Sequence, residues 1–441
     1  MKKLQKASLG LSALAFVLLL AGIFTGTPTL WQPSGLALSV CLSIGIGAVS
    51  ALKGYQYTVW IITAVIAGMI YPDAFLHWGD FDLRNKWLIL IIVQLVMFGM
   101  GIQMSLKDFS GLVRNGRGVL IGLFCQFSIM PLTGFLLTRV FHFEPEIAAG
   151  IILIGSCSSG LASNVMVYIA RANLVLSVTI TAMATLIAPL MTPFLMKMLA
   201  GTLIEIRFID MMMEIIKIVI VPIGAALLHD YLKNASFKGR RTVYSITALC
   251  SVWLLLLPLG LWQLLQTELS LPLQQTVEVF SFFAGAVIAG AVYHQLTRRI
   301  TRLDSIMPYF SMFGIVYFTT VTTAAGRDNL LQVGLLLFLA SVLHNAAGYF
   351  FGYWLSRAFG MDKNSCRTIA FEVGLQNGGM ASGLAGTMGK LGTVGLAAAV
   401  FSPWMNVSGS ILANYWKRKK LQKEKVSGAD AEVRIERQEA G

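Results

Sequence analysis

Two hydrophobic segments of this chain are interrupted by glycines and small polar residues, and they lie more than 200 positions apart. The first interruption is GSCSSGLASN at residues 155–164, and the second is FEVGLQNGGM at residues 371–380. Backbone that leaves a helix at membrane depth must be covered by protein or must line a water-filled cavity. Paired interrupted segments in two halves of a chain are typical of a transporter's binding site. The pattern therefore predicts a membrane transporter.

The composition agrees with a membrane protein. Of 441 residues, 56% are hydrophobic and only 12% are charged, whereas soluble domains carry about 25% charged residues. The hydrophobic blocks have the length that crosses a bilayer, about 17–25 residues. We expect an all-α polytopic fold with about fourteen spanning segments, at 8–26, 34–51, 55–71, 87–104, 118–139, 146–170, 174–200, 208–230, 243–265, 276–296, 307–325, 331–355, 368–386 and 394–414.

The net charge of +13 is distributed as the positive-inside rule demands, and it does not indicate nucleic acid binding. With the N-terminus in the cytoplasm, most loop Lys and Arg residues fall inside, as at 233–241, 298–302 and 357–367. The loops expected outside hold only Arg84, Lys86, Arg207, Arg327 and Lys390. This distribution predicts that both termini are cytoplasmic in a plasma membrane, most naturally the bacterial inner membrane.

The two ends of the chain lie outside the expected transport unit. Segment 8–26 is read as a retained helix, although a cleaved signal peptide is the alternative. Residues 416–441 begin with Lys417-Arg418-Lys419-Lys420 and read as a basic, disordered cytoplasmic tail. The five cysteines are scattered, and no nucleotide, zinc or other cofactor motif is present. The sequence therefore predicts no cofactor and no enzymatic activity.

Charged side chains within the expected spans are few. Glu214 and Lys217 are three residues apart on one helix face, so a structural ion pair is the expected role. Glu372 has no such partner on its own segment, since Arg367 is expected near the membrane interface. A lone carboxylate in a span costs about 2.5–3.5 kcal/mol and marks an ion pathway, unless it lies near the headgroups at a helix end.

Other polar residues accompany the two interruptions. Ser163 and Asn164 follow the first, and small-residue packing explains the serine better than it explains the asparagine. Ser177 and Thr181 are four apart on the next segment, and Gln126 lies on segment 118–139. Taken singly, each could be bonded to backbone. Gln376 follows Glu372, and amide and hydroxyl oxygens suit a small hard cation such as Na⁺.

Several motifs together resemble the bile acid:sodium symporter family. They are FGMG (98–101), QFSIMP (126–131), GSCSSGLASNVMVYIAR (155–171), LSV (176–178), EVGLQN (372–377) and FSPWMNVSG (401–409). They occur in the family order. The resemblance implies a ten-helix core of two inverted repeats of five, in which the fourth and ninth helices are broken and cross. This core would span 55–415. Residues 1–54 would add one helix pair and 243–296 an inserted second pair.

The resemblance also implies two Na⁺ sites that share Glu372. One would use Ser163, Asn164, Ser177, Thr181 and Glu372; the other would use Gln126, Glu372, Gln376 and the carbonyls of Val373 and Leu375. Asn377, Asn406 and Leu161 would lie near a small organic anion. The chain departs from the family at Ser158–Leu161 and at Met405, which leaves the solute open. A proton-coupled or uncoupled carrier, and a sensor or scaffold that does not transport, remain as alternatives. The oligomeric state is open too.

Overall fold

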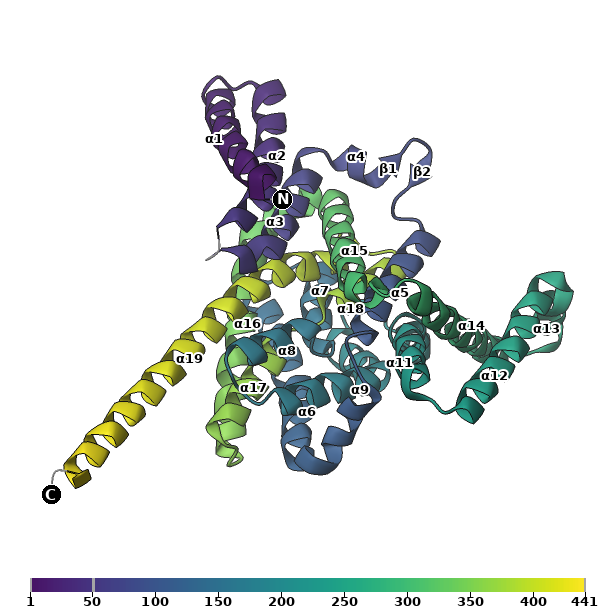
Figure 1. Ribbon diagram of the computed structural model, residues 1–441. Coiled ribbons are helices and arrows are strands. Elements are labelled where there is room, and N and C mark those ends of the chain that lie inside the picture. Colours follow the sequence, from purple (N-terminus) through teal and green to yellow (C-terminus); the bar gives the residue numbers. More distant parts are fainter. Residues whose placement is uncertain (1, 50–51, 440–441) are drawn as a thin grey trace.

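The computed structural model describes residues 2–49 and 52–439, and of residues 2, 53, 110, 112–114 and 420–439 it describes the backbone alone. The fold is helical apart from a short hairpin of β1 (His77–Trp78) and β2 (Phe81–Asp82), which pair antiparallel. Figure 1 shows a central bundle from which two groups of helices and the C-terminal helix project. The expected all-α class is confirmed.

Every expected spanning segment coincides largely with helix, and only segment 34–51 ends on residues, 50–51, that lie outside the described part of the chain. The helices outside the interrupted segments are α1 (Lys2–Phe24), α2 (Pro28–Gly45), α3 (Gln56–Ile70), the short α4 (Pro72–Leu76), α5 (Lys86–Gly101), α6 (Leu106–Phe141), α9 (Leu174–Ala200), α14 (Leu271–Arg299), α15 (Leu303–Ala325), α16 (Arg327–Ala358) and α19 (Val394–Glu439). Helix α6 is kinked at Asn115. Within the described residues, nine helices are long and apolar enough to cross a membrane, and three shorter apolar ones accompany them. The total of fourteen spans stays a prediction.

Two further helical segments change pitch beside a proline. Phe208–Ile215 (α10) passes through a π turn, Ile216–Ile220, into Val221–Asn234 (α11), where Pro222 follows the turn. Phe237–Leu256 (α12) passes through Leu257–Leu261, which contains Pro258, into Trp262–Glu268 (α13). Proline cannot donate an amide hydrogen, so local widening of the helix is its expected consequence. The first turn stays helical, whereas the second is kinked at Gly260, whose φ of 109° is not helical.

Both glycine-rich segments are broken as expected. The first divides into α7 (Pro145–Ser156) and α8 (Leu161–Ile169), and the second into α17 (Lys363–Gly374) and α18 (Gly378–Thr387). The backbones of the two breaks form hydrogen bonds with each other. The Asn377 amide donates to the Ser158 carbonyl at 2.9 Å, and the Gly160 amide donates to the Leu375 carbonyl at 3.1 Å. Each break therefore satisfies backbone groups that the other leaves free.

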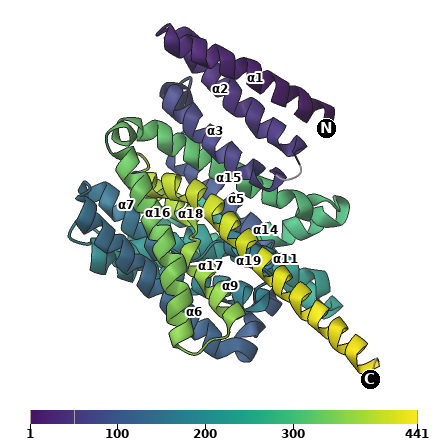
Figure 2. The same ribbon diagram turned by 90° about the vertical axis from the view of Figure 1, so that its left-hand side faces the viewer.

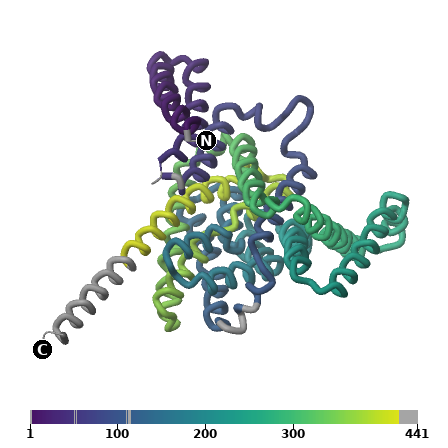
Figure 3. The backbone as a smooth tube through the Cα atoms, viewed as in Figure 1, coloured from purple at the N-terminus to yellow at the C-terminus, as the bar shows by residue number. Residues whose placement is uncertain are grey.

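The additional helices lie at the edge of the bundle. In Figures 1 and 2, α1 and α2 form a hairpin beside α3. In Figure 1, α12 and α13 project to the right of the bundle, and α14 runs back to pack against α11. None of the side chains of α12 or α13 is buried. The expected domain boundary near residue 54 lies next to residues 50–51, which the structure does not describe. The expected C-terminal tail is described by its backbone alone beyond Lys419. Figure 3 shows the extent of these stretches.

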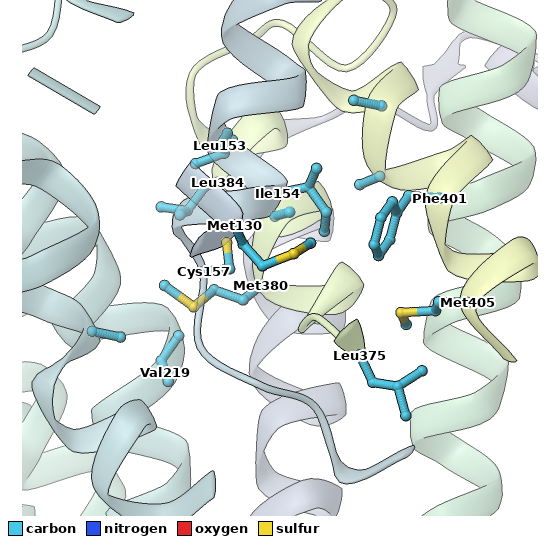
Figure 4. Close-up of a cluster of buried hydrophobic side chains, with 14 of the residues drawn as sticks. Met130, Leu153, Ile154, Cys157, Val219, Leu375, Met380, Leu384, Phe401 and Met405 are labelled. Atoms are coloured by element: carbon cyan, nitrogen blue, oxygen red, sulfur yellow. The ribbon is translucent and has the colours of Figure 1, made fainter. Parts of the chain in front are cut away.

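The hydrophobic core surrounds the two breaks. Figure 4 shows Met130, Ile154 and Met380 around Cys157, and Met405 beside Leu375; Cys157 and Leu375 belong to the interrupted backbone itself. Gly160 suits this position, because a Cβ atom there would lie 3.0 Å from the Gln376 carbonyl oxygen, closer than ordinary van der Waals contact. The breaks are thus covered by protein on this side and held in one arrangement.

Candidate functional site

Glu372 lies at the last turn of α17, and its side chain is fully buried. Its Oε2 lies 2.7 Å from Ser159 Oγ and 2.9 Å from Thr181 Oγ1, and its Oε1 lies 2.5 Å from Ser177 Oγ. These hydroxyls come from the first break and from α9. In the described part of the chain, no basic side chain pairs with this carboxylate. The structure thus places a carboxyl group where the two breaks meet, and no described cationic side chain lies beside it.

Asn164 and Ser163 complete this cluster from α8. Asn164 Oδ1 lies 2.7 Å from Ser177 Oγ and 3.3 Å from Thr181 Oγ1. Ser163 Oγ donates to the Gly160 carbonyl and lies 3.5 Å from Thr181 Oγ1. All five residues of the first expected set therefore lie together. Because each hydroxyl has a single proton, Ser177 and Thr181 cannot each satisfy both Asn164 and Glu372.

The residues of the second expected set also lie close together, at the second break. Gln126 Nε2 donates to Gln376 Oε1 and to the Cys157 carbonyl, at 2.9 Å each. Gln376 Nε2 in turn donates to the Val373 carbonyl at 2.7 Å. The Leu375 carbonyl accepts the Gly160 amide instead, although a carbonyl has a second lone pair. Gln126 Oε1 is buried and has no hydrogen-bond partner.

These residues fit a small hard cation. The first cluster has more oxygen acceptors than protons to share among them, and the second contains an orphaned amide oxygen. Buried polar oxygens without partners are costly, and a cation would satisfy them. Hydroxyl, amide, carboxylate and carbonyl oxygens are hard ligands, which suit hard cations. No cluster of three or more His, Cys, Asp or Glu residues occurs among the described residues, so a site for a transition metal is not supported there.

Ser159 is a residue that sequence reasoning missed. It is one of two adjacent serines in the first break, and nothing in their spacing distinguishes the one that reaches Glu372. The signal that could have found it is the position itself, where the chain departs from the pattern expected of the family. Ser159 also forms the bridge to Gln376 across the two breaks. It therefore connects the two clusters.

The three expected substrate residues are more scattered. Asn377 is buried and caps α18, because its Oδ1 accepts the Met380 amide at 3.0 Å. Its Nδ2 has only a distant contact, 4.0 Å from Met100 Sδ. Asn406 is half-buried on α19 and donates to the Ser402 carbonyl, and Leu161 begins α8. No hydrogen bond joins Asn377 to Asn406 in the part of the chain that is described.

Glu214 and Lys217 form the expected ion pair, with Lys217 Nζ 2.6 Å from Glu214 Oε1. The inserted helix α14 adds a second carboxylate, Glu278, at 3.0 Å, which the sequence did not predict. The three residues line a cavity of about 980 Å³ that α5, α10, α14 and α18 border. This cavity does not include Glu372.

Comparison with known proteins identifies the family. The model of the sodium bile acid symporter family matches residues 89–261. An uncharacterised sodium-dependent transporter of Bacillus subtilis is 31% identical over 86% of this chain and 96% of its own length. A probable chloroplastic sodium/metabolite cotransporter of Arabidopsis thaliana is 27% identical over 82% of this chain and 73% of its own length.

More distant similarities agree. The human ileal sodium/bile acid cotransporter is 25% identical over 66% of each chain. Among solved structures, a sodium proton antiporter of Methanocaldococcus jannaschii is similar in fold, with a TM-score of 0.54 at 14% identity, over 89% of this chain and 99% of the antiporter. This chain, with its two broken helices that meet around a buried carboxylate, belongs to the sodium bile acid symporter family, whose members are membrane transporters and not enzymes.

Proposed function

We propose that this protein is a Na⁺-coupled symporter that carries a small organic anion by alternating access. The observation that carries the proposal is the environment of Glu372: a fully buried carboxylate, contacted by hydroxyls from the first break and from α9, with no basic partner among the described residues. A buried charge without a partner is costly, so a bound cation is its natural complement. The relatives described above are named as sodium-dependent transporters or sodium cotransporters, which supports Na⁺ as that cation.

Two Na⁺ ions are proposed to share this carboxylate. The first would take oxygens from Ser163, Asn164, Ser177 and Thr181, and the second from Gln126, Gln376 and the carbonyls of Val373 and Leu375. A shared carboxylate lowers the electrostatic cost of holding both ions close together. Since the second ion depends on the orphaned Gln126 oxygen, Gln126 is the ligand that separates the two sites by mutation.

The solute is proposed to be an anion that binds beside the same crossing. Four helix ends meet there, and α8 and α18 both begin at the breaks. The N-terminus of a helix carries partial positive charge, and its free amides bind anions, whereas the C-termini of α7 and α17 favour cations. Asn377, Asn406 and Leu161 would line this anion's site. Helices α3 to α9 would form one inverted repeat, and α10, α11 and α15 to α19 the other.

Uptake by purified protein in proteoliposomes tests the proposal. A panel of labelled monocarboxylates and bile acids should include at least one solute whose uptake an inward Na⁺ gradient drives and an equal K⁺ gradient does not. Uptake driven by a proton gradient in the absence of Na⁺ would replace Na⁺ coupling with H⁺ coupling. Uptake insensitive to either gradient would indicate an uncoupled carrier, and binding of a solute without uptake would indicate a sensor. We further propose a bacterial inner membrane with both termini cytoplasmic, which labelling of introduced cysteines at residues 236 and 269 tests from the two sides.

A further inference from the structure

A groove of about 900 Å³ runs along the outside of the bundle between α16, α17 and α19. We call it the α16–α19 groove. Much of its wall is aromatic, and Phe350, Trp354, Ile411 and Tyr415 on its rim are largely exposed. Exposed apolar side chains of membrane-spanning helices face lipid. The groove therefore opens towards the bilayer, away from the cavity at Lys217.

The charged side chains that line this groove are all basic: Lys363, Arg367 and Lys419. Lys363 begins α17 and Arg367 lies about one turn further along the same helix. Lys419 lies about one turn beyond Trp416 on α19, and the Trp416 ring contacts Arg367. The three therefore gather at one end of the groove. Among the side chains that the structure describes, no carboxylate lines it. A ligand with a negatively charged end is the one that this arrangement complements.

Arg367 is the most informative of the three. The sequence predicts that it lies near the membrane interface, and the structure shows that only 5% of its surface is exposed. Its Nε is buried without a hydrogen-bond partner, and no salt bridge to it exists in the described part of the chain. Its guanidinium carbon lies 5.5 Å from the centre of the Trp416 ring, which holds it against the groove. A buried guanidinium without an anion is costly.

A second donor without an acceptor belongs to the same groove. Trp404 Nε1 is also buried and unpartnered. The orphaned groups of the groove are thus both donors, in contrast to the orphaned acceptor at Gln126. A ligand for this groove must supply oxygen acceptors to Arg367 and apolar surface to the aromatic residues.

We propose that the α16–α19 groove binds an anionic phospholipid from the surrounding bilayer. Its phosphate would accept charge-assisted hydrogen bonds from Arg367, with Lys419 nearby, because guanidinium groups bind phosphate in a forked geometry. An acyl chain would lie along Phe350, Trp354 and Ile411. The membrane supplies this ligand directly, and basic residues at the end of a spanning segment attract anionic lipid.

The groove is connected to the broken helix through its inner wall. Ser408 Oγ donates to Asn345 Oδ1 at 2.6 Å, and Asn345 Nδ2 donates to the carbonyl of Gly374, the last residue of α17, at 2.8 Å. Asn345 and Ser408 both line the groove. A lipid seated there would bridge α16, α17 and α19, and binding to the native state alone should stabilise the protein.

Thermal unfolding of the delipidated protein in neutral detergent tests the proposal. Phosphatidylglycerol should raise Tm in a saturable manner, and phosphatidylcholine at the same concentration should not. Arg367→Gln should weaken phosphatidylglycerol binding about ten- to a hundredfold, the loss expected for a hydrogen bond to a charged group. Lys419→Gln, at an exposed position, should weaken binding less. It provides a second readout if Arg367→Gln does not fold.

Arg298→Gln is the matched control, because it removes the same charge from an exposed position on α14, away from the groove. It should leave phosphatidylglycerol binding unchanged. If Arg298→Gln and Lys419→Gln lost affinity for phosphatidylglycerol equally, the proposal would be overturned, because the loss would then be a general effect of removing a positive charge. Equal stabilisation by phosphatidylcholine would also overturn it. Stabilisation by glycerol phosphate alone, as strong as by the lipid, would overturn the assignment to a lipid.

Discussion

Replacing Glu372 by Gln should abolish the stabilisation of this protein by Na⁺. The substitution keeps the size of the side chain but removes the charge. Its amide oxygen can still accept from Ser159 and Thr181, while its amide nitrogen would donate to Ser177 Oγ, which can turn its own proton to Asn164 Oδ1. Two unit charges 4 Å apart interact by about 4 kcal/mol at an effective dielectric constant near 20. Losing this attraction weakens Na⁺ binding about a thousandfold.

The expected effect on stability follows from this loss of affinity. At a Na⁺ concentration of a hundred times Kd, binding stabilises the native protein by about 2.7 kcal/mol. After a thousandfold loss of affinity the same concentration is about a tenth of Kd, and the stabilisation falls to about 0.06 kcal/mol. Thermal unfolding in NaCl and in KCl of equal ionic strength measures the difference. The wild-type protein should unfold at a higher temperature in NaCl, and Glu372→Gln at the same temperature in both.

Glu214→Gln is the control for a carboxylate in a spanning helix. Lys217 keeps its second partner, Glu278, in this variant, so that no buried cation is left alone. The variant should retain the full difference between NaCl and KCl. A Glu372→Gln protein that keeps the Na⁺ response, or a Glu214→Gln protein that loses it, would refute the assignment of the ion site.

Three further substitutions separate the remaining roles. Thr181→Val removes one hydroxyl next to Glu372, so about tenfold more Na⁺ should be needed for the same rise in unfolding temperature. Thr179→Val on the same helix is the control, because the Thr179 hydroxyl bonds the backbone carbonyls of Val175 and Asp108, and it should leave the Na⁺ dependence unchanged. An equal Na⁺ dependence in the two variants would exclude Thr181 as a ligand. Asn406→Ala should weaken anion binding, measured by calorimetry, about five- to a hundredfold and should keep the stabilisation by Na⁺. If the variant lost the stabilisation by Na⁺ and kept its affinity for the anion, Asn406 would be a cation ligand instead. Asp362→Ala removes the cap of α17, with bonds to Asn364 and Ser365, and should cost about 1 kcal/mol in chemical unfolding. Burial acts to raise the pKa of Asp362, but bonds from Ser365 and Asn364 lower it more. The Asp362 cap therefore contributes its full stabilisation above the ordinary pKa of an aspartate, and this stabilisation should be lost as pH falls through the lower pKa of Asp362 in the folded protein. If the unfolding free energy of Asp362→Ala depended on pH as that of the wild type does, this prediction would be contradicted.

The helices and both breaks could be predicted from the sequence because they depend on local chemistry. Length and apolarity define a membrane span, and glycine with small polar residues interrupts it, so residues 155–164 and 371–380 were identifiable without a structure. The structure agrees on the positions of the helices and of both interruptions.

Contacts between distant segments could not be predicted in the same way. The pairing of Ser159 with Glu372 depends on how the two breaks face each other, and the burial of Arg367 depends on Trp416 from another helix. The approach of Glu278 to Lys217 likewise depends on where the inserted helix α14 packs. A lone sequence contains no direct signal for any of these three contacts.

Equilibrium binding of ²²Na⁺ to the purified protein tests the central claim most directly. The proposed site predicts saturable binding of about two ions per chain that unlabelled Na⁺ displaces and K⁺ does not. Glu372→Gln should abolish this binding, and Gln126→Leu should remove one of the two ions. Absence of saturable binding to the wild-type protein, or binding to Glu372→Gln equal to that of the wild type, would contradict the account.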